Sequence, residues 1–238
     1  MRYKSLILVC TLLVGSVASS ALDERSFEEA SFPGAETPAG KMLEKRIMAQ
    51  ALIDHGMDTS SPEAILVGVR ILHENPVVNA QNAADQKSSE DQIQELKGLV
   101  EKAVEMRPDD KILAELASRI GSELEEKTRG LAGGPKRWTV NIKKGEYYLL
   151  DPRLVYDVQQ EAIVSARVVA SAENPQERDA TVGITVARDG SAKSLYTRSV
   201  AKNKTQVRWN SGPYKAGWYV KIHHLSGPDE TNVVIETN

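Results

Sequence analysis

The spacing of apolar residues differs between the two halves of the chain. Between residues 41 and 128, apolar residues recur every three or four positions, which is typical of amphipathic helices. Ser61 with Pro62 marks one helix start, and Pro108 followed by two acids marks another. We therefore expect four helices in two antiparallel hairpins. Their apolar stripes are Leu43, Ile47, Ala51 and Leu52; Ile65, Leu66, Val69, Ile71 and Leu72; Ile93, Leu96, Val100, Ala103 and Val104; and Ile112, Leu116, Ile120 and Leu124.

Beyond a glycine-rich linker at 129–136 the period changes to two, which is typical of half-buried strands. Val182, Ile184 and Val186 alternate with small or polar residues, and Asp189-Gly190 predicts a hairpin turn. The pattern predicts about eight strands, near 137–142, 146–150, 154–158, 161–171, 180–187, 192–200, 204–209 and 216–224, and a last one at 232–237 that is placed to pair with the first. The expected fold class is α+β with segregated domains: a helical domain at 41–128, then an antiparallel β-sandwich or jelly roll at 137–238.

The first 21 residues have the three parts of a secretory signal peptide: a basic start, an apolar run and small residues. We expect cleavage after Ala21, with Ala18 as the alternative, followed by a flexible lead-in at 22–40. The apolar run is well short of the roughly 20 residues that span a bilayer, so no stable membrane anchor is expected after cleavage. Cys10 lies inside this run, which leaves the mature chain without a thiol. The predicted location is periplasmic or secreted.

Charge is distributed unevenly between the two halves. Residues 22–135 have 13 basic and 22 acidic residues, a net charge of −9, whereas residues 136–238 have 15 and 11, a net charge of +4. Opposite signs support two units and allow them to dock electrostatically. The overall net charge of −3 does not indicate a nucleic-acid partner.

The stretches "VRWNSGPYKAGWYVKIHH" and "NVVIETN" resemble the end of the bacterial pre-peptidase C-terminal-like domain, and "GEYYLLDPRLVYDVQQEAIVSARVVAS" is similar to its opening pattern. The resemblance spans Trp138–Asn238 and implies a β-sandwich. "SPEAILVGVRILHENP" is similar to the helical signature of exported bacterial proteins of unknown role that carry this sandwich. The family commonly has an Asp-x-Asp-Leu strand whose acids can support calcium. Here that strand reads Thr181-Val182-Gly183-Ile184, so the resemblance does not carry a calcium site.

Alternation along the last strands separates core from surface. Trp209 and Trp218 are on the inward side, so we expect them to fill the core. Tyr219, Lys221 and His223 are on the outward side and are the candidate ligand-facing residues, against the alternative of an ordinary solvated face. His223 and His224 point to opposite faces of a strand and cannot easily share a metal ion. His55 and His73 have no partner at metal-ligand spacing.

No catalytic motif is present, neither G-x-S-x-G nor H-E-x-x-H, so no catalytic, metal or cofactor residues are predicted. The favoured function is a non-catalytic binding or adaptor protein of the bacterial envelope, whose sandwich recognises a protein or a glycan. One alternative is a structural or assembly protein that docks a partner through its helices. A hydrolase with an unrecognised site is the other.

Overall fold

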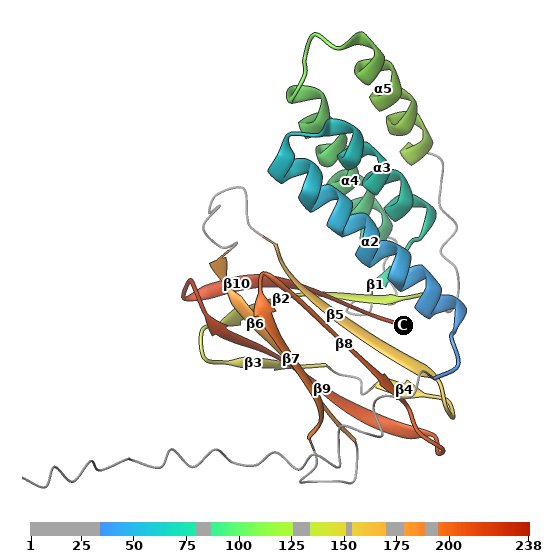
Figure 1. Ribbon diagram of the computed structural model, residues 1–238, viewed down its shortest axis with the longest axis vertical. Helices are drawn as coiled ribbons and strands as arrows, with labels where there is room; N and C mark the ends of the chain where they lie inside the picture. Colours follow the sequence, from blue (N-terminus) through green and yellow to red (C-terminus); the bar gives the residue numbers. More distant parts are fainter. Residues whose placement is uncertain (1–33, 80–86, 126–133, 151–153, 170–178, 189–194) are drawn as a thin grey trace, which may run out of the picture.

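The computed structural model describes residues 34–79, 87–125, 134–150, 154–169, 179–188 and 195–238, with helices above a two-layered β structure (Figure 1). The predicted signal peptide with its cleavage after Ala21 or Ala18, Cys10, most of the linker and the Asp189-Gly190 turn lie outside these residues. The described part is α+β with segregated elements, four helices followed by a sandwich, which confirms the predicted fold class. None of the described helices is both long and apolar enough to span a bilayer.

The helices are α2 (Pro38–Thr59), α3 (Pro62–Glu74), α4 (Lys87–Glu105) and α5 (Lys111–Glu125). Each predicted helix is present. Pro38 and Pro62 occupy first-turn positions, where the missing N–H costs nothing. The Thr37 hydroxyl accepts a hydrogen bond from the Gly40 amide at 2.9 Å, and a carboxylate oxygen of Asp110 accepts from Leu113 at 3.0 Å. These side chains cap α2 and α5.

Two of the predicted apolar stripes have a different phase in the structure. In α2 the buried residues are Leu43, Arg46, Ala49 and Ile53 rather than Ile47, Ala51 and Leu52, because Ile47 and Ala51 face the sheet instead of the other helices. In α5 the buried stripe starts at Leu113, and Ile112 is 81% exposed. The remaining helical core is as expected, with α3 in the centre, except that Ala117 is buried where Leu116 was predicted; it comprises Ile65, Leu66, Val69, Leu72, Leu96, Val100, Ala103, Ala117, Ile120 and Leu124.

The strands form two sheets. One has the order β1-β2-β10-β5-β8 and the other β3-β9-β6-β7, with β4 also paired to β9. Their bounds are β1 (Val78–Asn79), β2 (Lys136–Lys143), β3 (Tyr147–Leu149), β4 (Leu154–Tyr156), β5 (Glu161–Val169), β6 (Thr181–Arg188), β7 (Leu195–Lys202), β8 (Lys204–Asn210), β9 (Ala216–Ser226) and β10 (Glu230–Thr237). The last strand pairs antiparallel with the first strand of the sandwich, as predicted. The short parallel strand β1, which precedes α4 in the chain, was not predicted.

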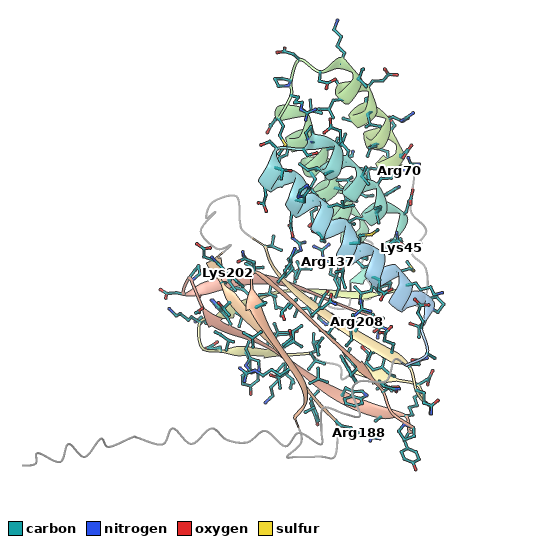
Figure 2. All side chains as sticks on the ribbon, in the orientation of Figure 1. Lys45, Arg70, Arg137, Arg188, Lys202 and Arg208 are labelled. Carbon is teal, nitrogen blue, oxygen red and sulfur yellow. The ribbon has the colours of Figure 1, made fainter. Side chains whose placement is uncertain are left out.

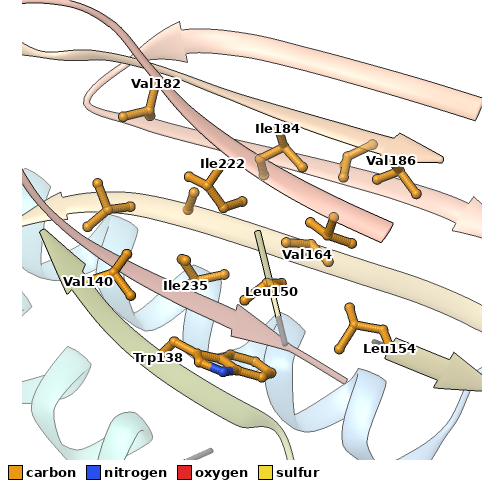
Figure 3. Packing of buried hydrophobic residues seen from close by; sticks show 14 of the residues in the cluster. Trp138, Val140, Leu150, Leu154, Val164, Val182, Ile184, Val186, Ile222 and Ile235 are labelled. Atoms are coloured by element: carbon orange, nitrogen blue, oxygen red, sulfur yellow. The ribbon is translucent and has the colours of Figure 1, made fainter. Parts of the chain in front are cut away.

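The sandwich core lies between the two sheets (Figure 3). Trp138, Val140 and Ile235 come from one sheet, and Ile184 and Ile222 from the other. Trp209 and Trp218 are 2% and 1% exposed, with ring centroids 5.6 Å apart, which confirms that they are core residues. His224 is also fully buried, and its Nδ1 donates a hydrogen bond to the Ile142 carbonyl at 3.0 Å.

One buried ion pair joins the helices to the sandwich. Arg46 of α2 reaches Glu236 of β10, with Nη2 2.7 Å from Oε1 and Nε 3.2 Å from Oε2. The same guanidinium donates through Nη1 to the carbonyl oxygens of Leu72 and Asn75 at the end of α3. Both side chains are almost fully buried, so their donors and acceptors must be satisfied within the protein. Arg46 therefore fixes the end of α3 and the outer face of the sheet to one point on α2.

Further ion pairs surround this contact, and in most of them the acid belongs to the helices. Arg137 lies 2.8 Å from Glu95, and Arg167 lies 3.7 Å from the other oxygen of the same carboxylate. Lys204 pairs with Asp54, and Arg208 with Glu44. Figure 2 shows Arg137 and Arg208 along this seam. The acidic helical half thus meets the basic sandwich through charged side chains, while the two hydrophobic cores stay separate.

Acid should weaken this seam. Burial by itself would raise the pKa of Glu236, but Arg46, followed by Arg137 and Arg167, more than offsets that effect and holds the pKa below its ordinary 4.5. A carboxyl with a lowered folded-state pKa contributes its full stability above the unfolded pKa and loses it as pH falls through the folded one. We expect Glu236→Gln to lower the free energy of unfolding at pH 7 by about 3 kcal/mol, because Arg46 stays buried without its partner.

The difference between Glu236→Gln and the wild type should shrink as pH falls below 4.5. Urea unfolding of both proteins between pH 7 and pH 3 measures it. The control is Glu74→Gln, which removes an exposed helical carboxylate and should change stability little at any pH. A difference that stays constant over this range would contradict the assignment.

Candidate functional site

The sheet β3-β9-β6-β7 has an outer face that the described helices do not cover. The helices pack on the other sheet, where α2 lies over β5 and β10 (Figure 1). Successive strand residues point to opposite faces, so the buried Val220 and Ile222 place Tyr219, Lys221 and His223 on this outer side. The three candidate residues from the sequence therefore share one face, as the alternation predicted.

Strand register arranges this face into two neighbouring rows. One row runs Tyr147, His223, Gly183 and Val200 across β3, β9, β6 and β7. The next runs Leu149, Lys221, Thr185 and Arg198 across the same four strands. Tyr219 follows on β9, opposite Ala187. Because the rows are built on paired strands, the backbone fixes the spacing of these side chains.

Tyr147 is the centre of a small aromatic and cationic cluster. The centroid of its ring lies 5.7 Å from the centroid of the His223 ring, and the two ring planes are inclined at 48°. Lys221 Nζ lies 4.7 Å from the centroid of the Tyr147 ring, within the range of a cation–π contact. Tyr147 is still 54% exposed. The Tyr147 ring therefore has two side-chain contacts, while much of its surface is open to a ligand.

Apolar side chains surround this cluster. Of the eleven large apolar side chains that are exposed among the described residues, five lie on this one face. They are Tyr147, Leu149, Val155, Val200 and Leu225. Val200 and Leu225 converge over Gly183, where an added Cβ would lie 3.3 Å from Val200 Cγ2 and 3.4 Å from Leu225 Cδ1. Such clustering is typical of an interaction surface, whereas single exposed apolar residues are ordinary.

The face is also basic. The described strands β3, β4, β6, β7 and β9 contain no Asp or Glu, while Arg198 and Lys221 are on the outer side. Partial burial, followed by the charges of Arg198 and Lys221, holds the pKa of His223 below its ordinary 6.5. The imidazole is therefore mostly neutral at pH 7, and it can donate or accept a hydrogen bond.

The sequence pattern identified only a minority of this surface. It selected Tyr219, Lys221 and His223 but not Tyr147, Leu149, Val155, Val200 or Arg198. Alternation shows which residues of one strand share a face, but not how two strands are aligned. Tyr147 belongs to this surface because β3 pairs with β9 in the register that places Tyr147 beside His223. No sequence period indicates which residues of two distant strands will face each other.

The positions considered for metal binding are separated in the structure. His223 is on the outer face of the sheet and His224 is in the core, while His55 and His73 lie on different helices. The Thr181 hydroxyl accepts a hydrogen bond from Ser226 at 2.8 Å, and Gly183 lies beneath Val200 and Leu225. The part of the chain that the structure describes contains no group of three or more His, Cys, Asp or Glu side chains placed to hold a metal ion.

Comparison with known proteins gives no family. No family model matches the chain, so the resemblance to the pre-peptidase C-terminal-like domain has no support there, and no curated protein matches either. Among solved structures, a mitogen from Yersinia pseudotuberculosis is 9% identical, with a TM-score of 0.31, over 44% of this chain and 85% of that one. A carbohydrate-binding module from Cellvibrio mixtus lichenase 5A in complex with cellotriose is 11% identical, with a TM-score of 0.28, over 44% and 88%. Likenesses at these TM-scores carry no argument about function.

Titration of His223 tests the electrostatics of this face. Removing a neighbouring positive charge makes the imidazolium less costly, so Lys221→Gln should raise the pKa of His223 toward 6.5. The proton chemical shifts of the imidazole, followed by NMR against pH, report this change. Lys215→Gln, in the turn between β8 and β9, serves as the control and should leave the titration unchanged. An unchanged midpoint in Lys221→Gln would show that the two side chains are not neighbours in solution.

Proposed function

We propose that this chain is an exported, non-catalytic binding protein, and that the outer face of β3-β9-β6-β7 is its recognition surface. The observation that carries the proposal is the coincidence of five exposed apolar side chains with a basic, acid-free sheet face. Export is supported by the signal-peptide pattern at residues 1–21. The resemblance to exported bacterial proteins with a pre-peptidase-like sandwich agrees with this role.

The chemistry of the face favours a protein partner with an acidic, partly apolar surface. Aliphatic side chains such as Leu149, Val155 and Leu225 form a good centre for a protein interface, whereas sugars stack mainly on aromatic planes. Tyr147 is the aromatic anchor, and Lys221 and Arg198 supply positive charge without acidic neighbours on these strands. A partner that presents carboxylates around an apolar patch would complement both properties.

The size of the face sets an expectation for affinity. Strands lie about 4.8 Å apart and rise about 3.4 Å per residue, so a sheet of this size presents roughly 500 Å². A standard protein interface buries about 800 Å² on each partner. The face alone therefore suits a transient complex or an adaptor contact rather than a permanent one.

A charge-reversal experiment tests the proposal. Two variants of the mature chain are compared with the wild type: Tyr147→Ala with Lys221→Glu on the face, and Tyr214→Ala with Lys215→Glu as a matched control. Tyr214 is 70% exposed in the turn between β8 and β9, so the control removes an exposed ring and reverses an exposed charge elsewhere on the sandwich.

Quantitative cross-linking in envelope extract should recover the same partner with the wild type and with the control. Recovery with the face variant should fall at least about tenfold, as expected when a central aromatic and a cation are lost together. Recovery that falls equally in both variants would contradict the proposed face. Binding to an envelope glycan after proteolysis of the extract, with no protein partner, would replace the protein by a glycan ligand.

A further inference from the structure

A second concave region lies between the helices and the covered sheet. Part of the contact between α2 and the strands is open, beside the buried Arg46. A largely apolar compartment of about 230 Å³ opens between Ile47 and Ala51 of α2 and Val234 of β10. It joins a larger, charged compartment of about 500 Å³ at Gln50, Arg167 and Lys204, which line both.

The apolar compartment explains the unexpected phase of α2. Ile47 and Ala51 were predicted as core residues, but the structure turns them toward this space. Apolar side chains that line a space accessible to solvent lack the apolar contacts that a well-packed interior supplies. An apolar group of matching size would restore them. The volume is many times the roughly 15 Å³ that a single water molecule requires, so a short hydrocarbon chain has room in it.

Charge at the junction of the two compartments is not balanced. Three arginines, Arg46, Arg137 and Arg167, share two carboxylates, Glu236 and Glu95. Arg46 pairs with Glu236, and Arg137 pairs with one carboxylate oxygen of Glu95. Among the described residues, the ion pair of Arg167 is therefore a long one, with its guanidinium 3.7 Å from the other oxygen of Glu95. The neighbouring Lys204 is matched by Asp54 at 2.9 Å. Among these seven described side chains one positive charge is therefore in excess, and the guanidinium with the longest ion-pair distance, that of Arg167, lines both compartments.

The environment of Arg167 makes this excess costly. Burial lowers the pKa of its guanidinium from the ordinary value, and the attraction of Glu95 offsets this only in part. An arginine presents a planar set of donors that matches a carboxylate with two parallel hydrogen bonds. A single bound carboxylate would supply both the missing charge and the missing acceptors.

We propose that this groove binds a small amphipathic monocarboxylate, with its carboxylate on Arg167 and its short apolar tail between Ile47, Ala51 and Val234. The site is independent of the outer sheet face, so the chain has two binding regions on opposite sides of the sandwich. The tail fits the 230 Å³ compartment, and the head lies at its junction with the charged one. A ligand of this kind would also strengthen the seam, because it contacts both the helices and the sheet.

The test uses hexanoate as the probe, with hexanol and hexylamine as tail-matched controls that are neutral and positively charged. Binding is followed by NMR, through the methyl signals of Ile47 and Val234, and by calorimetry. Hexanoate should shift both methyl signals, hexanol should bind at least about tenfold more weakly, and hexylamine should not bind.

Three variants separate the contributions. Arg167→Gln should weaken hexanoate binding at least about tenfold and leave hexanol binding unchanged, since only the carboxylate loses a charged partner. Ala51→Met, at a solvent-accessible position that lines the groove, fills the apolar compartment and should weaken the binding of both probes. Arg208→Gln, which removes a seam ion pair that lines neither compartment, should weaken neither.

The proposal is overturned if hexanol binds as tightly as hexanoate, if saturating hexanoate leaves both methyl signals in place, or if Arg208→Gln weakens hexanoate as much as Arg167→Gln does. Should Arg167→Gln fail to fold, the three probes on the wild type and on Ala51→Met still decide the outcome. None of these results depends on the outer face of β3-β9-β6-β7, so the two proposals fail separately.

Discussion

The contact between Arg46 and Glu236 determines how this protein is assembled. Each half has its own hydrophobic core, and the two clusters of buried apolar residues share no member among the described residues. A buried arginine instead satisfies a carboxylate of β10 and two carbonyl groups at the end of α3. Burial makes this geometry demanding, because either charge left alone would cost far more than the pair contributes. The helices are thereby held over one particular sheet.

Because the helices pack on only one of the two sheets, their position also determines which outer sheet face stays exposed. Because the helices cover the outer face of β2-β10-β5-β8, the outer face of β3-β9-β6-β7 is left to carry Tyr147, Lys221 and their apolar neighbours. The same seam contains the space beside Arg167, which is lined from both the helices and the covered sheet. Both binding proposals thus follow from one mode of docking.

The sequence predicts the helices, the strands and the core tryptophans well, but it does not predict the contacts between distant side chains. Trp209 and Trp218 were identified as core residues because strand alternation and size agree, and β10 was placed beside β2 correctly. Arg46 and Glu236 could not be identified in this way. Each looks like an ordinary solvent-facing charge on its own element, and they are 190 positions apart.

The candidate surface shows the same limit. Tyr219, Lys221 and His223 follow from alternation within one strand, whereas Tyr147 and Val200 join them only through the register between strands. In α2 the helical period predicted the spacing of the apolar residues but not which of them are buried, because Ile47 and Ala51 face strands that are more than 100 positions away in the chain, β5, β8 and β10. Local patterns predict which residues of one helix or strand share a face. Which residues of another element they contact depends on the complete fold.

The most direct test of this account is a thermodynamic cycle through Arg46→Met, Glu236→Leu and the double variant, measured by urea unfolding at pH 7. Each single variant should lose about 3 kcal/mol or more, since each leaves one charge buried without its partner. The double variant should lose much less than the sum, because neither charge then remains in the seam. Single effects that simply add would show that the two side chains do not act on each other, and would contradict the account of how the helices are held on the sandwich.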